Sequence, residues 1–419
     1  MARRFNYSNS DNAKELGFPL WCKQMGANPF INRWALHEFS VYLVENYGCL
    51  YRHGFGVSKG FKGCGGNLVH GNNALLIRQA EKWVPYKPSN LFTCSTRTCV
   101  SCGYKLALGD VRESMQGITE YAYSKPAFEN AYSELQPVAG RSVIQICLTC
   151  SHTKEESLQK VRDDNMRARK LFWDDRTTKG VFSEIGVDAT CIANESPYGD
   201  NGWAFHPHVL AFCHTAVDTG AVESALTPVW IKKVEKVGRR AITGPCLSVD
   251  GGESVKTYLA KQAFELGFGN YGKDRGGHSH LRTPFHILYD CADWYYKAVL
   301  QYGHESNAPK DEYEAWLSDV FVYLEWMDTM KGTRFFRWTP ESKAVFPWLA
   351  SDEQKVKEYD QNGHKIMSIL NGRVFWRSLS KAERFQLQRF GIRDDFEGLA
   401  DFVSSRGFEY IDERKESEN

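Results

Sequence analysis

The chain of 419 residues has no large excess of charge of either sign, since 52 Lys and Arg stand against 51 Asp and Glu. Proteins that work on nucleic acid are often strongly basic, so a formal net charge of +1 speaks against such a partner. The charge is uneven along the chain, however. Between Lys232 and Lys261 seven basic residues stand against three acidic ones, whereas nine acidic residues and three basic ones follow from Asp394 onward. A locally basic middle is therefore masked by an acidic tail.

Three other absences narrow the class of protein. No run of 18 apolar residues occurs, so we expect no membrane span and no membrane partner. The start, MARRFNYSNSDN, lacks the apolar segment of a secretory signal, which makes the cytoplasm the expected compartment. Repeats and low-complexity tracts are also missing, which argues against a solenoid. In a long chain of this kind, the 12 cysteines are expected to be thiols or metal ligands rather than disulfides.

The composition that is present, with 42% hydrophobic and 25% charged residues, is that of an ordinary globular protein. The length allows one large core or two to three domains. We predict an N-terminal region over residues 1–135 that carries a cysteine cluster. A central domain over 136–300 holds the strand-like runs, and a mostly helical region with the acidic tail occupies 301–419.

Hydrophobic periodicity in the central region predicts strands mixed with helices. Strands are expected at residues 141–150, 186–193 and 203–212, and helices at 155–173, 254–266 and from Thr283-Pro284 onward. The turn signal Asn201-Gly202 predicts that the second and third strands form a hairpin. The expected class is α+β, with a central antiparallel sheet covered by helices on one face.

Two histidines fall in the third predicted strand, as His206-Pro-His208. Residues two apart in a strand point to the same face, so the two imidazoles are expected side by side. Glu195 precedes the turn and could add a carboxylate from the partner strand. Two His and one carboxylate leave coordination positions open for a substrate. The alternative is one core histidine and one exposed histidine, and Pro207 favours a strand at a sheet edge.

A second His-x-His, His278-Ser-His280, lies beside Gly276-Gly277 without an apolar strand pattern, so we interpret it as a loop. Tyr258 and Lys261 are three residues apart in a helical pattern and share one face. A phenol can attack phosphorus where a cation polarises the phosphate, and a lysine can stabilise the developing charge. The alternative is a half-buried tyrosine that only packs.

A cysteine cluster, Cys94-x4-Cys99-x2-Cys102, has the spacing of a zinc knuckle, in which a turn lets two thiolates reach one tetrahedral ion. A fourth ligand is required, and Cys64 and His70 are the nearest upstream candidates. The cysteines in strand-like runs, among them Cys147, Cys150, Cys191 and Cys213, are expected to be buried thiols.

In their order along the chain these motifs resemble those of the HUH endonuclease superfamily, and in particular the replication initiators (Rep proteins) of rolling-circle plasmids. Ile146-Cys-Leu-Thr149, followed by His152, resembles the first family motif. The stretch ESPYGDNGWAFHPHVLAF, from Glu195 to Phe212, resembles the second, and Tyr258-Leu-Ala-Lys261 resembles the third. The upstream cysteines and the segments from Arg282 and Lys331 are similar to family segments, so the likeness spans roughly residues 90–340.

The resemblance implies an HUH/RRM-like palm, a five-stranded antiparallel sheet with the metal on the sheet and the tyrosine on a nearby helix. It implies that Glu195, His206 and His208 hold Mg²⁺ or Mn²⁺. Tyr258 would attack a phosphate of single-stranded origin DNA with assistance from Lys261, and the 3′-OH would prime a host polymerase. A host helicase is a further implied partner. Two departures are Pro207, where the family has a bulky hydrophobic residue, and Glu253, which lies too far around a helix from Tyr258 to end the cycle.

Two other functions fit the same residues. A relaxase or transposase of the same superfamily would use the same site for another purpose. A zinc-containing nucleic-acid-binding protein without catalysis would use Tyr258 for packing and the His pair for structure.

Overall fold

The computed structural model describes residues 33–62, 64, 74–78, 87–88, 94–122, 138–240, 246–251, 281–350, 364–379, 383, 386–387, 390 and 395–416. It divides into two compact units, each built from separated segments. The unit that contains both chain ends, here called the terminal unit, takes residues 1–103, 287–324 and 353–419. The other, here called the sheet unit, takes residues 104–286 and 325–352.

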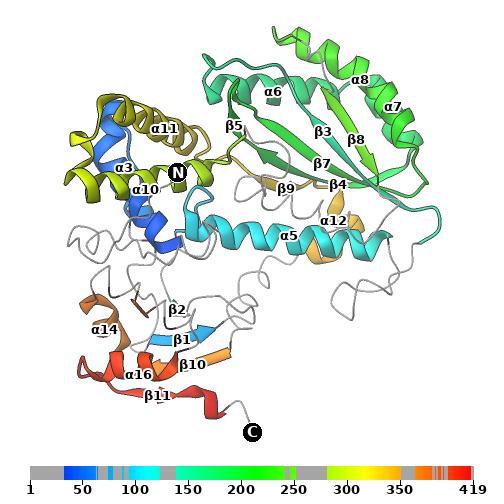
Figure 1. Cartoon of the computed structure of the whole chain (residues 1–419). Helices are drawn as coiled ribbons and strands as arrows, with labels where there is room; N and C mark the ends of the chain where they lie inside the picture. Colours follow the sequence, from blue (N-terminus) through cyan, green and yellow to red (C-terminus); the bar gives the residue numbers. More distant parts are fainter. Residues whose placement is uncertain are drawn as a thin grey trace. The chain divides into compact units, whose positions relative to one another are not determined.

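The sheet unit is built on five antiparallel strands in the order β8-β3-β7-β4-β9 (Figure 1). The strands are β3 (Ser142–Leu148), β4 (Val187–Glu195), β7 (His206–Cys213), β8 (Leu247–Gly251) and β9 (Phe336–Trp338). The helices are α5 (Val100–Ala122), α6 (Leu158–Trp173), α7 (Arg176–Glu184), α8 (Thr219–Lys236), α12 (Ser342–Val345) and the 3-10 turn η4 (Pro347–Ala350). The predicted α+β class and antiparallel sheet are therefore confirmed.

The predicted hairpin is formed by β4 and β7, which pair from Val187–Cys213 to Glu195–His206. Between them lies a small ribbon, β5 (Tyr198–Gly199) and β6 (Gly202–Trp203), whose two turn residues are Asp200 and Asn201. Gly202 has a φ of +81°, and a Cβ there would lie 2.9 Å from the Lys154 Cα and the Thr153 oxygen. Both facts explain why glycine stands at this position.

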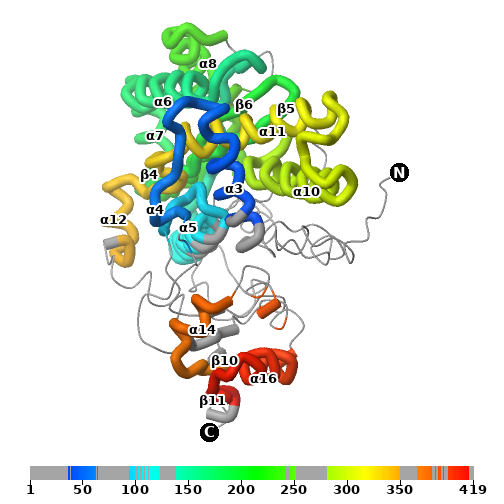
Figure 2. The backbone as a smooth tube through the Cα atoms, turned by 90° about the vertical axis from the view of Figure 1, so that its left-hand side faces the viewer, coloured from blue at the N-terminus to red at the C-terminus, as the bar shows by residue number. Residues whose placement is uncertain are grey.

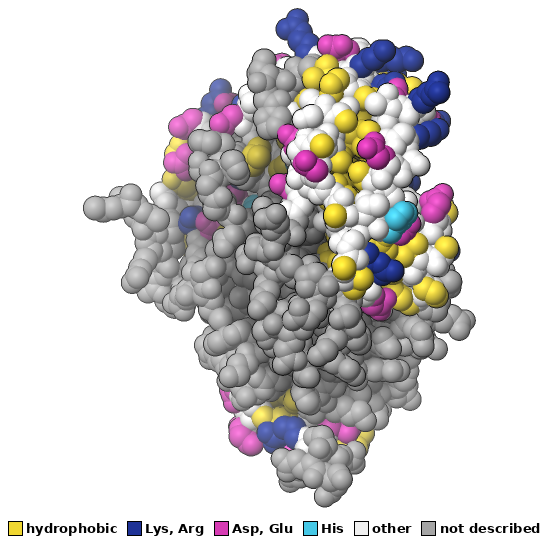
Figure 3. Space-filling view, turned by 90° about the vertical axis from the view of Figure 1, so that its right-hand side faces the viewer, with side chains coloured by type: hydrophobic (Ala, Val, Ile, Leu, Met, Phe, Trp, Pro, Cys, Tyr) yellow, Lys and Arg dark blue, Asp and Glu magenta, His cyan; other side chains and the backbone are white. Residues whose placement is uncertain are grey.

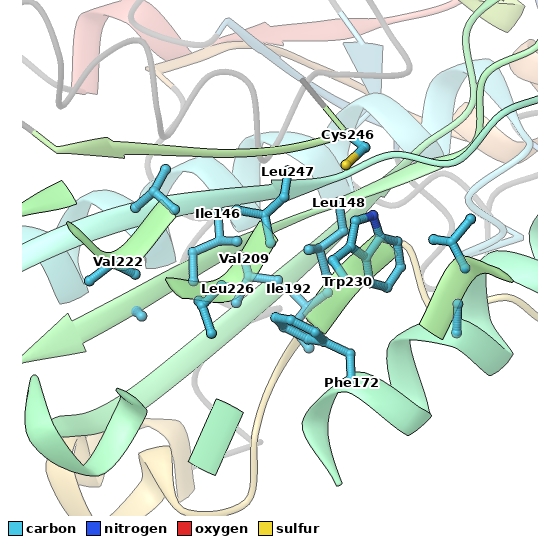
Figure 4. Packing of buried hydrophobic residues seen from close by; sticks show 14 of the residues in the cluster. Ile146, Leu148, Phe172, Ile192, Val209, Val222, Leu226, Trp230, Cys246 and Leu247 are labelled. Atoms are coloured by element: carbon cyan, nitrogen blue, oxygen red, sulfur yellow. The ribbon is translucent and has the colours of Figure 1, made fainter. Parts of the chain in front are cut away.

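One face of the sheet is covered by α6, α7 and α8, and Figure 4 shows the side chains between them. Ile144, Ile146 and Leu148 alternate along β3 toward this core, as a half-buried strand requires. Trp230 of α8 is fully buried against Phe172 of α6. Its indole donates to the Thr149 carbonyl oxygen at 2.7 Å, so its single polar group is satisfied.

The amphipathic helix expected at 155–173 is α6, which begins at Leu158 after the cap residue Ser157. Leu158 and Val161 are buried, whereas Met166 is exposed. Glu325 ties this helix start to the turn ribbon, since its carboxylate accepts from the Leu158 amide at 2.7 Å and the Trp203 indole at 2.8 Å.

The opposite face of the sheet is covered in part by α5, α12 and η4. Ile118 and Tyr121 of α5 pack on Leu210 and Phe212 of β7, together with Phe346. Helices therefore lie on both faces of the sheet, whereas cover was expected on one, because α5, α12 and η4 come from outside the central region 136–300.

The terminal unit combines segments that are far apart in the sequence. Its helical part contains α3 (Arg33–Tyr51), α4 (Lys59–Lys62), α10 (Pro284–Tyr302), the 3-10 turn η3 (Glu305–Asn307) and α11 (Lys310–Thr329); the ends of α10 and α11 continue into the sheet unit. The predicted helix start at Thr283-Pro284 is confirmed, with the Thr283 hydroxyl accepting from the His286 amide. Tyr42 and Tyr47 of α3 both donate to the buried Glu305 carboxylate, at 3.1 and 2.6 Å.

The terminal unit also holds a four-stranded sheet in the order β11-β10-β1-β2. The strands are β1 (Ala74–Arg78), β2 (Lys87–Pro88), β10 (His364–Ile369) and β11 (Tyr410–Asp412), with helices α14 (Gly372–Ser378) and α16 (Phe396–Ser404) and the 3-10 turn η5 (Glu413–Glu416). Figure 2 shows α14, α16, β10 and β11 together. Met367, Phe375 and Leu399 are fully buried in their shared core. The zone beyond residue 300, expected to be mostly helical, thus contributes strands to both sheets.

Among the described helices, none combines the length and the apolar character that crossing a membrane requires.

Candidate metal centres

The predicted residues Glu195, His206 and His208 lie together at one end of the five-stranded sheet. His206 pairs with Glu195 across β7 and β4, and all three side chains point to the face opposite α6 and α8. The His206 Nε2 atom is 3.4 Å from Glu195 Oε2, and the His208 Nε2 atom is 3.5 Å from Glu195 Oε1. Glu195 is only 2% exposed. A buried carboxylate between two imidazoles is stabilised by positive charge held among them, as a proton or a metal ion.

The hydrogen bond of His206 fixes which ring nitrogen faces the glutamate. Its Nδ1 atom lies 2.7 Å from the Ala204 carbonyl oxygen, which can only accept, so Nδ1 carries the proton. In the neutral ring, Nε2 then keeps a lone pair directed toward Glu195. A histidine that donates its other N–H to a backbone carbonyl is the usual arrangement of a metal-bound imidazole.

His208 is contacted by Gln145 of β3, whose amide nitrogen Nε2 lies 2.8 Å from Nδ1. Rotation of that amide by half a turn lets its oxygen accept from Nδ1–H, which leaves the Nε2 lone pair toward Glu195. The Nε2 atom of His208 has no hydrogen-bond partner among the described residues, although the side chain is buried. These are the surroundings that a metal-binding nitrogen requires.

Glu195 contacts the two rings through different carboxylate oxygens, Oε2 toward His206 and Oε1 toward His208. Glu195, His206 and His208 are therefore candidate ligands of one divalent ion, since imidazole and carboxylate are both common metal ligands.

One residue at this centre was missed in the sequence. Cys147 of β3 pairs with His208, and its sulfur lies within 4.8 Å of ligand atoms of both histidines. The expectation that Cys147 is a buried thiol was wrong, since it is only partly buried. The expectation is confirmed for Cys150, Cys191 and Cys213.

Burial of these three thiols raises the pKa of each, to about 12 for Cys213. Cys147 and Gln145 are two residues apart in β3 and share the face that holds the histidine pair. That they lie beside these histidines follows only from the register of β3 with β7.

Pro207 lies in the central strand of the sheet, so the expected placement on an edge strand was wrong. The proline pairs with Asn194 on β4, whereas the pairing of β7 with β3 begins one residue later, at His208. The missing N–H therefore falls at the end of the sheet, where β3 leaves one side of β7 unpaired.

The second candidate centre is formed by Cys64, Cys94, Cys99 and Cys102, whose sulfur atoms lie within 4.8 Å of one another. The Cys64–Cys102, Cys94–Cys102 and Cys99–Cys64 sulfur distances are 3.4, 3.6 and 3.7 Å. Thiolates bound at about 2.3 Å to a tetrahedral zinc would be about 3.8 Å apart. The structure brings Cys64 to the other three, whereas His70 lies outside the described residues. The four thiols could hold a metal such as zinc.

Local structure explains why these cysteines converge. Cys64 follows α4 in a turn, with its amide donating to the Phe61 carbonyl oxygen. Cys102 lies in the first turn of α5, where the helix N-terminus favours a thiolate. Burial raises the pKa of Cys99, whereas hydrogen bonding, first of all from Cys102, lowers the pKa of Cys94. Four such thiols cannot all be charged without a cation, which a metal supplies.

The predicted nucleophile lies outside the described residues. This is true of Tyr258, Lys261, Glu253 and the second pair His278 and His280. The strand that precedes them, β8, ends at Gly251 beside Ile144 of β3.

No family model, curated protein or solved structure matches this chain.

Proposed function

We propose that the protein is a metal-dependent endonuclease that nicks one DNA strand at an origin and so initiates rolling-circle replication. The observation that carries this proposal is the convergence of Glu195, His206 and His208 on one face of a five-stranded antiparallel sheet. The ordered motifs of the sequence support it, because Tyr258 and Lys261 follow β3, β4 and β7 in the order of the family motifs that they resemble.

Each residue has a distinct role in the proposed reaction. The Tyr258 oxygen loses its proton and bonds to the scissile phosphorus, while the bond from phosphorus to the 3′ oxygen breaks. The products are a 5′-phosphotyrosyl link and a 3′-OH that can prime a polymerase. Lys261 stabilises charge on the phosphate, and Mg²⁺ or Mn²⁺ at the His pair would supply Lewis-acid polarisation.

Charge on the helix layer is compatible with a DNA partner. On the face drawn in Figure 3, Lys and Arg side chains gather at the upper end, where α6 to α8 lie. Lys232 and Lys236 of α8 are exposed, but Lys233 pairs with Asp175 and Arg239 pairs with Glu156 and Asp164.

The test is covalent capture of DNA. We expect the protein with Mn²⁺ and a single-stranded origin oligonucleotide to form an adduct that survives a denaturing gel. Tyr258→Phe should abolish the adduct and retain DNA binding, because only the nucleophile is lost. His206→Gln should reduce the rate of adduct formation by about 100-fold or more, because the variant loses a metal ligand and the ion would stabilise the charge that develops on the phosphate.

Two outcomes would overturn parts of this proposal. An undiminished adduct in Tyr258→Phe would remove that residue as the nucleophile. DNA binding with no adduct on any origin-like oligonucleotide would favour a non-catalytic zinc-containing binding protein, for which the four-cysteine cluster is the supporting observation. Adduct formation only on transfer-origin or transposon-end DNA would favour a relaxase or a transposase.

A further inference from the structure

A cysteine lies where the sheet centre would be expected to offer only oxygen or nitrogen ligands. Cys147 stands directly across from His208 on the neighbouring strand β3, and its sulfur is within 4.8 Å of both imidazoles. Unlike Cys150, Cys191 and Cys213, it is not fully buried. It therefore combines a thiol, two imidazoles and solvent access at one point of the sheet.

We propose that Cys147 is a ligand of the sheet metal and that its sulfur makes this centre select a thiophilic transition ion of the zinc class over Mg²⁺. The inference deepens the proposed function, since it concerns the ion at the same site. The expected Mg²⁺ or Mn²⁺ site of two histidines and one carboxylate thereby gains a sulfur ligand, and donor softness decides the metal.

The donor set determines the choice of ion. Mg²⁺ demands octahedral oxygen ligands and binds most of its positions through water or phosphate, whereas thiolate and imidazole favour zinc and related ions. His206, His208 and Cys147 provide two nitrogens and one sulfur. The three ligand atoms lie within 4.8 Å of one another, and the Glu195 carboxylate contacts both rings.

The strand order explains how two unlike ligands flank one histidine pair. β7 lies between β3 and β4, so the soft sulfur of Cys147 approaches from one side and the hard carboxylate of Glu195 from the other. The hairpin β4–β7 fixes the carboxylate relative to the rings. The pairing of β3 with β7 independently fixes the sulfur and also Gln145, which orients His208.

Cobalt(II) provides a direct readout, because a thiolate bound to Co²⁺ gives a near-ultraviolet charge-transfer band that nitrogen and oxygen ligands do not. Full-length protein with zinc in the four-cysteine centre would be titrated with Co²⁺, and the spectrum of Cys147→Ser subtracted. We expect a thiolate–cobalt band in the difference. In Cys147→Ser, the zinc affinity of the sheet centre should fall by at least about 10-fold. Loss of a residue that only hydrogen-bonds a metal ligand already costs that much, and loss of a ligand should cost no less.

Two further variants make the result specific. Cys49→Ser, which changes an exposed cysteine of α3, should leave both the band and the affinity unchanged. Cys147→Asp substitutes an oxygen donor and should abolish the band while raising affinity for Mn²⁺ and Mg²⁺ relative to Zn²⁺. Identical spectra and zinc affinities for the wild type and Cys147→Ser would overturn the proposal.

The result is separable from the nicking proposal. If Tyr258 forms the DNA adduct but Cys147→Ser binds metals like the wild type, the metal inference fails and the function stands. If the cobalt–thiolate band is present and no DNA adduct forms, the function fails and the metal assignment stands.

Discussion

Gln145 is a buried side chain that would orient one of the proposed metal ligands without touching the ion. It is 4% exposed, and its amide lies 2.8 Å from His208 Nδ1, where its oxygen can accept from Nδ1–H after rotation of the amide. We expect Gln145→Leu to weaken binding of Mn²⁺ or Zn²⁺ at the sheet centre by about 10–100-fold. Calorimetric titration of protein with the four-cysteine centre filled would measure this. Gln145→Glu, which keeps an acceptor, should retain most of the affinity, and equal losses in both variants would contradict the assigned role.

The same residues show what can be predicted at this scale. His206 and His208 share a face by the two-residue period of a strand, and a turn signal sufficed to place Glu195 opposite them. Cys147 and Gln145 could not be found in that way. Their approach depends on which strand lies beside β7 and in what register, and no local pattern carries that information.

At the scale of elements, the turn between β4 and β7 is held by Gly202. Its φ of +81° costs other residues about 1–2 kcal/mol, and a Cβ would also press on the backbone of Thr153 and Lys154. We expect Gly202→Ala to lower the free energy of unfolding by about 2–4 kcal/mol, measured by denaturant titration.

A matched control is available in α7. Gly180 is exposed, and no heavy atom lies within 4 Å of the position of its Cβ. Gly180→Ala should therefore stabilise the protein by about 0.5–1 kcal/mol through helix propensity. If Gly202→Ala and Gly180→Ala change the free energy of unfolding by similarly small amounts, the turn at Gly202 tolerates a side chain and the prediction is wrong.

Local signals accounted for β3, α6, the β4–β7 hairpin and the start of α10, because each is defined by periodicity or capping within a short window. The sequence did not predict that β9 joins the five-stranded sheet. It also did not predict that β1 pairs with β10 near the C-terminus. Ala74 pairs with Ile369, and Cys191 pairs with Trp338. Such pairings depend on complementary surfaces distant in the sequence, which single-segment patterns do not encode.

At the scale of the whole molecule, the two centres should differ in how readily they lose metal. The four-cysteine centre is closed, since Cys64, Cys99 and Cys102 are buried and the Cys99 sulfur also contacts His37 Nδ1 at 3.5 Å. In the sheet centre, Cys147 and His206 are only partly buried. Dialysis against a mild chelator should therefore strip the sheet ion and leave one equivalent of zinc, measured by elemental mass spectrometry.

Loss of that remaining zinc should affect the terminal unit selectively. Zinc binding of about 10 kcal/mol is comparable to the total stability of a domain, about 5–15 kcal/mol, so Cys99→Ser should loosen the elements that meet at the centre. Hydrogen exchange should report lost protection of α3 amides around His37, which contacts Cys99, while β3 and β7 remain protected by their own core. Cys49→Ser lies in the same helix and serves as the control, with zinc content and protection unchanged. A structural ion contributes its binding energy directly to the fold around it. Full protection of α3 in zinc-free Cys99→Ser would therefore show that packing alone holds the cysteines together.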